Sequence, residues 1–60
     1  MNYGVTILGK GRETVVFSDE KQRDFAVRLA LGEEGGYEDA TIFETDENPT
    51  HQSACEWFNS

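Results

Sequence analysis

The chain of 60 residues has no lysine or arginine after Arg28. Eight acids occupy that second part: Glu33, Glu34, Glu38, Asp39, Glu44, Asp46, Glu47 and Glu56. The first part carries five cations and four acids (+1), the second part carries −8, and the sum is −7. Direct binding to nucleic acid or to an acidic membrane is disfavoured, because an acidic surface without a basic stripe repels phosphates.

Cysteine, histidine and long apolar runs are also scarce. Cys55 is the single cysteine, so it cannot form an internal disulfide, and a secreted disulfide scaffold is disfavoured. One cysteine and one histidine are a poor start for structural zinc, which takes about four ligands. No apolar run approaches the ~20 residues that span a bilayer, and the N-terminus does not have the pattern of a signal peptide. We therefore expect a cytoplasmic protein without a metal or cofactor.

The length allows one domain, residues 1–60, and limits its stability. A chain this short buries only about 60% of the surface that its unfolded form exposes, and its free energy of unfolding is roughly 3–9 kcal/mol by per-residue scaling. Small domains of this kind are often stabilised by disulfides, metals or self-association. With the first two disfavoured, we expect a homo-oligomer, in its simplest form a two-fold dimer; the alternative is a monomer of marginal stability.

The first segment has the pattern of a β-hairpin over residues 2–17. In "NYGVTIL", Val5 and Ile7 alternate with other residues at the period of a strand, and "ETVVFS" repeats that period around Val15 and Phe17. The intervening "GKGR" supplies glycines that permit a tight turn.

Residues 19–31 have the pattern of a helix. Asp19 can cap its N-terminus, and Gly32 follows its last apolar residue, where a left-handed stop is common. One apolar stripe has helical spacing and comprises Phe25, Ala26, Leu29 and Ala30. We expect Phe25 and Leu29 to be buried against the strands, whereas Val27 and Leu31 form a second pair that lies either at the core edge or on a partner surface.

"DATIFET" predicts a strand over residues 39–45, and the C-terminal segment 48–60 is ambiguous. Pro49 could occupy the first turn of a short helix, or the segment could be an irregular tail anchored by Trp57 and Phe58. The prediction is an α+β fold, a small β-β-α-β domain whose three-stranded antiparallel sheet has one helix packed on a face, with a possible short C-terminal helix. Since one helix covers only one face, the other would need the C-terminal segment or another chain.

No motif indicates catalysis or metal binding. "LGKGRE" lacks the spacing of a P-loop and is followed by a strand instead of a helix. His51 and Cys55 are four residues apart, but a reactive thiol needs an electropositive neighbourhood that this acidic segment does not supply. A calcium loop starting at Asp46 would need glycine at its sixth position, where His51 stands. We predict that the protein is not an enzyme.

The segregated acids predict a surface that binds a basic partner. Such a surface steers encounter and raises association rates, and basic surfaces are commonly built for nucleic acids. In size, charge and compactness the chain is similar to small phage or mobile-element inhibitors that imitate nucleic acid, which implies a role in host–virus interaction. The predicted acidic face consists of Glu33, Glu34, Glu38, Asp39, Glu44, Asp46 and Glu47, with Glu44 and Asp46 about 6.7 Å apart if both lie on the strand.

Two other functions remain open. The chain could be an interaction or oligomerisation module that binds through an apolar surface formed by Val27, Leu31, Trp57 or Phe58. It could also be a homo-oligomeric binder that sequesters a nucleotide or another small anionic ligand. In that case Lys10, Arg12 and the two glycine-rich turns would hold the ligand.

Overall fold

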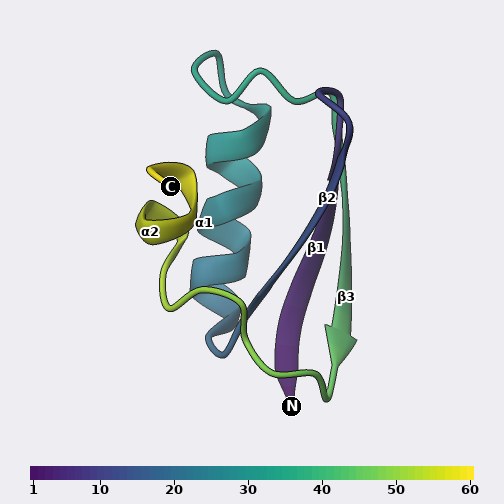
Figure 1. Ribbon diagram of the computed structural model, residues 1–60, viewed down its shortest axis with the longest axis vertical. Coiled ribbons are helices and arrows are strands. Elements are labelled where there is room, and N and C mark those ends of the chain that lie inside the picture. Colours follow the sequence, from purple (N-terminus) through teal and green to yellow (C-terminus); the bar gives the residue numbers. More distant parts are fainter.

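The computed structural model describes all 60 residues and shows a sheet with both helices on one side (Figure 1). The elements in chain order are β1 (Asn2–Leu8), β2 (Arg12–Phe17), α1 (Glu20–Leu31), β3 (Asp39–Thr45) and α2 (Ala54–Phe58). The three strands are antiparallel in the order β2-β1-β3. This confirms the predicted α+β fold, and the C-terminal segment does form a short helix. This helix begins at Ala54 with Ser53 as its N-cap, so the expected place of Pro49 in its first turn is wrong. Neither helix combines the length and apolarity needed to cross a membrane.

The ends of α1 follow local chemistry. The Asp19 side chain accepts a hydrogen bond from the Lys21 amide at 2.9 Å, so the predicted N-cap is confirmed. At the other end the Gly32 amide donates to the Arg28 carbonyl at 3.0 Å. Gly32 has φ −74°, so the left-handed stop that we expected there is wrong; the left-handed residue is Gly36, with φ +72°. The chain therefore turns later, in the loop that leads to β3.

The core lies between the sheet and α1. Its sheet side consists of Val5, Ile7, Val15 and Phe17, and its helical side of Ala26, Ala30, Ala54 and Trp57. The prediction for Leu29 is confirmed in part, because it is half-buried against this core, but the prediction for Phe25 is wrong, because Phe25 is 42% exposed. Phe25 is not buried because the bulky side chains of the strands already fill the interface, so α1 turns the side that carries the small residues Ala26 and Ala30 toward the sheet.

The opposite face of the sheet carries no helix, and its own side chains shield only one row of it. Exposed residues on this face include Leu8, Arg12, Thr14 and Thr41. Val16, Gly4 and Phe43 form one cross-strand row, and the Phe43 ring occupies the space where a side chain at Gly4 would stand. Beside this row, the hydroxyls of Thr6 and Thr14 lie 3.3 Å apart. The C-terminal segment does not cover this face, since α2 packs against α1 on the other side of the sheet (Figure 1). Gly4 thus lets one aromatic ring shield the row, and Val16 is only 2% exposed.

The two edges of the sheet differ. Thr50, in the segment after β3, pairs with Val16 on the outer side of β2: its amide donates to the Val16 carbonyl at 2.8 Å, and its hydroxyl accepts from the Val16 amide at 3.0 Å. No segment pairs with the outer side of β3. The open edge of the sheet is therefore the strand in the acidic half of the chain.

Candidate functional site

Five of the seven predicted acidic residues border β3: Asp39 and Glu44 lie on it, Glu38 directly precedes it, and Asp46 and Glu47 follow it (Figure 1). Glu33 and Glu34 lie further back, in the loop after α1, and Glu34 is beside Lys10 and Glu13, at the β2 edge of the sheet. A seven-residue strand is about 20 Å long, in a molecule whose longest dimension is 29 Å. All seven predicted acids are exposed. The five that border β3 (Glu38, Asp39, Glu44, Asp46 and Glu47) we call the acidic line; they follow the open edge of the sheet and do not form a compact cluster.

The acids on β3 itself point to different faces. Glu44 is paired with Tyr3 and lies on the face that α1 covers, whereas Asp39 is paired with Leu8 on the opposite face. The strand ends at Thr45, so the regular spacing expected between Glu44 and Asp46 stops before Asp46. A partner that follows the β3 edge would meet carboxylates from both faces of the sheet.

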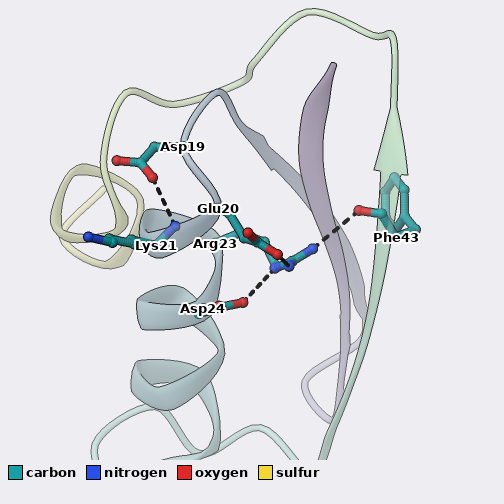
Figure 2. A network of polar contacts seen from close by, with 6 residues as sticks. All are labelled: Asp19, Glu20, Lys21, Arg23, Asp24 and Phe43. Atoms are coloured by element: carbon teal, nitrogen blue, oxygen red, sulfur yellow. Dashed lines mark hydrogen bonds and ion pairs between the residues drawn. The ribbon is translucent and has the colours of Figure 1, made fainter.

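These carboxylates have no cationic partner within the chain. The only two ion pairs involve Arg23, which contacts Glu20 at 3.3 Å and Asp24 at 2.7 Å (Figure 2). None of the eight acids from Glu33 onward takes part in an ion pair. The negative charge along β3 is therefore not neutralised by the protein itself.

Arg23 is a buried cation that was not predicted from the sequence. It is 4% exposed, its Nη1 donates to the Phe43 carbonyl at 3.3 Å, and its guanidinium carbon lies 5.6 Å from the centre of the Tyr3 ring (Figure 2). Glu20, three residues earlier on the same helix, was the available signal, but such a pair also fits an exposed helix surface. Through its hydrogen bond to the Phe43 carbonyl, Arg23 links α1 to β3, the strand that carries the acidic line.

The residues predicted to form an apolar surface do not stay together. Leu31 is 47% exposed and Val27 is half-buried, both on α1, whereas Trp57 is 5% exposed and belongs to the core. Phe58 is half-buried against that core. Ile42 was missed: it is 56% exposed, although it lies on the face of β3 turned toward α1. Its position on an edge strand explains why a β-branched residue remains in solvent.

The two glycine-rich turns meet at one end of the molecule. The Lys10 ammonium lies 5.5 Å from the centre of the Tyr37 ring, and a Cβ on Gly36 would be 3.1 Å from Lys10 Cε. Gly9, at φ +143°, approaches the backbone of Tyr37 and Glu38 so closely that a Cβ would be 2.7 Å from the Glu38 amide. Only glycine permits this approach, and it brings the first turn against the loop before β3.

Lys10 and Arg12 do not form a joint anion site. Arg12 is exposed and is paired with Leu8, on the open face of the sheet. The Lys10 ammonium lies against the Tyr37 ring and lines the same cavity as Glu13. Glu13 and Arg12 are adjacent on β2, so their side chains point to opposite faces of the sheet. The two cations that we expected to hold an anion are thus directed to different sides of the sheet.

A cavity of about 350 Å³ lies beside Lys10, between the glycine-rich turns and α2. It is lined by Lys10, Glu13, Glu34, Tyr37, Trp57 and Phe58, among others. Glu13 is central, because its Oε1 accepts from the Tyr37 hydroxyl at 3.2 Å and its Oε2 accepts from the Trp57 indole at 2.9 Å. Burial raises the pKa of Tyr37 above its ordinary value, and the hydrogen bond to Glu13 and the charge of Glu13 raise it further.

The aromatic rings of the cavity pack in series. The Trp57 ring centre lies 6.2 Å from that of Tyr37 and 5.9 Å from that of Phe58. These separations fall within the range of favourable aromatic pairs. The cavity therefore combines carboxylates with a set of aromatic side chains held in fixed positions.

His51 and Cys55 do not form a catalytic pair. α2 begins at Ala54, so His51 lies before the helix and its Nδ1 is 2.9 Å from the Thr50 hydroxyl. Cys55 is exposed on α2, and no hydrogen bond joins it to His51. The helix therefore does not bring the two side chains together.

Comparison with known proteins finds no matching family model, no matching curated protein and no matching solved structure.

Proposed function

We propose that this protein is an acidic interaction module that binds the basic surface of a nucleic-acid-acting protein and inhibits it. The observation that carries the proposal is the acidic line: five exposed carboxylates along an open sheet edge, none of them in an ion pair. A partner with lysines and arginines in the matching positions would supply the missing positive charge.

The length of the acidic line fits a surface built for nucleic acid. The ~20 Å of β3 correspond to about six steps of one DNA strand at ~3.4 Å per step. Each exposed ion pair contributes only about 0–1 kcal/mol, so affinity requires several of them together. Charge complementarity of this kind chiefly raises the association rate and is weakened by salt.

The test begins with capture of the partner. The protein is immobilised and incubated with host cytoplasm at low and at high salt, and the bound proteins are identified. We expect a basic, nucleic-acid-acting protein that is retained at low salt and released at high salt. Added in solution, the module should then compete with nucleic acid for the purified partner.

A charge-reversal variant tests the acidic line directly. Glu44→Lys, Asp46→Lys and Glu47→Lys together change the net charge from −7 to −1, since each reversal adds +2. All three side chains are exposed, so circular dichroism should show an unchanged fold, while partner affinity should fall by orders of magnitude because several attractions become repulsions. The matched control is Val27→Ser with Leu31→Ser, which should bind normally. Normal binding by the triple variant and lost binding by the serine pair would contradict the proposal.

Exposed apolar residues favour a second candidate, an interaction or oligomerisation module. Ile42 and Leu31 are 56% and 47% exposed on two elements that pack against each other, β3 and α1. Binding through them would depend weakly on salt and would be lost in an Ile42→Ser, Leu31→Ser variant. Sedimentation at micromolar concentration distinguishes a partner surface from a homo-oligomer contact. If these residues form a homo-oligomer contact, their substitution lowers the sedimentation coefficient of the isolated protein; if they contact a different protein, it does not.

A further inference from the structure

We infer that the cavity between the glycine-rich turns and α2 binds a cationic side chain, an arginine or lysine, presented by the basic partner. The inference rests on the proposed function and deepens it, because it names the place where one partner residue would be anchored. The cavity is next to the start of the acidic line, because Gly9, beside Lys10, approaches the backbone of Glu38, and the loop before β3 supplies Glu34 to the cavity lining.

The charges of the cavity favour a cation. Its lining contains the carboxylates of Glu13 and Glu34 and one ammonium group, that of Lys10, so its formal charge is −1. Both oxygens of Glu13 accept hydrogen bonds from neutral donors, Tyr37 and Trp57, which orient the carboxylate without neutralising it. Two carboxylates repel phosphate, so a nucleotide is a poorer ligand for this cavity than a guanidinium or ammonium group.

The aromatic side chains strengthen that preference. A guanidinium or ammonium group is attracted to the face of a tyrosine or tryptophan ring within about 6 Å. Lys10 already occupies such a position, 5.5 Å from the centre of the Tyr37 ring. This internal cation shows that the ring face accepts positive charge, and it would have to leave when a partner side chain enters.

The size and rigidity of the cavity suit one anchoring side chain. At about 350 Å³ it is at the lower end of the range for ligand pockets. Trp57 is 5% exposed and fixed by its bond to Glu13, so little conformational freedom is lost on binding. Arginine in a preformed aromatic pocket is a common centre of binding energy at protein interfaces.

The test uses a minimal probe. An acetylated and amidated Gly-Arg-Gly tripeptide is titrated into the protein, and the same tripeptide with citrulline, which is neutral but of similar shape, is the control. Trp57 is the only tryptophan, so its fluorescence reports on the cavity. We expect a saturable change with the arginine peptide and no binding of the citrulline peptide; equal binding of both would overturn the inference.

Three variants place the effect in the cavity. Lys10→Met removes the internal competitor and should raise affinity for the arginine peptide about two- to fivefold. The Glu34 side chain is exposed and makes no hydrogen bond, so Glu34→Gln should keep its fold. Its affinity for the arginine peptide should fall about threefold or more, because a carboxylate of the cavity is lost. Glu47→Gln, on the far end of β3, is the matched control and should have no effect. Weaker binding of the arginine peptide by Lys10→Met would show that Lys10 does not compete with it, and Lys10-dependent quenching of Trp57 by adenosine monophosphate would show an anion site; either result would overturn the inference.

The two proposals fail in different ways. If the triple reversal at the far end of β3 abolishes partner capture, but the arginine peptide does not bind, the cavity inference is wrong and the acidic line stands. If the peptide binds as expected, but the triple reversal captures the partner normally, the cavity stands as a cation site and the proposed function is wrong.

Discussion

Replacing Arg23 by methionine tests how the strand that carries the acidic line is attached to the rest of the molecule. Methionine keeps an unbranched apolar stem and removes the guanidinium group. In the folded protein this group is 4% exposed and contacts the Phe43 carbonyl, Glu20 and Asp24 (Figure 2). The substitution therefore separates α1 from the β3 backbone without creating a large cavity.

The expected loss of stability follows from these contacts. A hydrogen bond from a charged donor contributes about 1.5–3 kcal/mol, and the 3.3 Å distance to Phe43 places it at the weak end. The two carboxylates are 58% and 59% exposed, so each ion pair adds only about 0–1 kcal/mol. The contact with the Tyr3 ring adds about 0.5–1 kcal/mol. The free energy of unfolding should therefore fall by about 2–4 kcal/mol, a large part of the roughly 3–9 kcal/mol expected for 60 residues.

Thermal unfolding followed by Trp57 fluorescence measures this change. For a domain of this size the midpoint should fall by about 10–30 °C. The single variants Glu20→Gln and Asp24→Asn serve as controls and should each change stability by less than about 1 kcal/mol. If Arg23→Met melts within a few degrees of the wild type, the cost of burying the guanidinium cancels its contacts, and the attachment of β3 through Arg23 is refuted.

Two further predictions concern the loop before β3 and the cavity. Gly35→Ala should strongly destabilise the protein in urea unfolding, because its Cβ would collide with the carbonyl groups of Leu29 and Ala30; Gly32→Ala, at an ordinary φ of −74°, should cost much less, and equal losses would contradict this reasoning. Because the pKa of Tyr37 is raised above its ordinary value of 10.0, Tyr37 contributes to the free energy of unfolding fully at pH values below 10.0. This contribution declines as the pH rises through the folded-state pKa. Tyr37→Phe should remove this part of the alkaline loss, and an unchanged pH profile in that variant would exclude Tyr37 as its source.

The strands and the helix could be predicted because their signals are local. Alternating β-branched residues mark β1 and β2, and the Asp19 cap marks the start of α1. Which side of α1 faces the sheet could not be predicted in the same way. Phe25 and Ala26 are neighbours in one apolar stripe, and the volume of Phe17 and its neighbours on the sheet decides which of them is buried.

The cavity could not be predicted from the sequence for a related reason. The Glu13 carboxylate is bonded to residues 24 and 44 positions away, Tyr37 and Trp57, and no periodic pattern links such distant side chains. The exposure of the acids, in contrast, follows from the cost of burying unpaired charge. Thus the acidic line was predictable as a set of exposed residues, whereas its arrangement along one strand edge required the fold.

The open edge of β3 also bears on self-recognition. An unpaired strand edge invites pairing with the same strand of another copy, and proteins commonly block this with charged residues. Two β3 strands side by side would bring Glu38, Asp39, Glu44, Asp46 and Glu47 of each copy together, with no cation between them. The carboxylates therefore disfavour pairing between the β3 strands of identical copies. A homo-oligomer of this protein, if it forms near neutral pH, has to use a surface other than the β3 edge, which leaves that edge free for the basic partner proposed above.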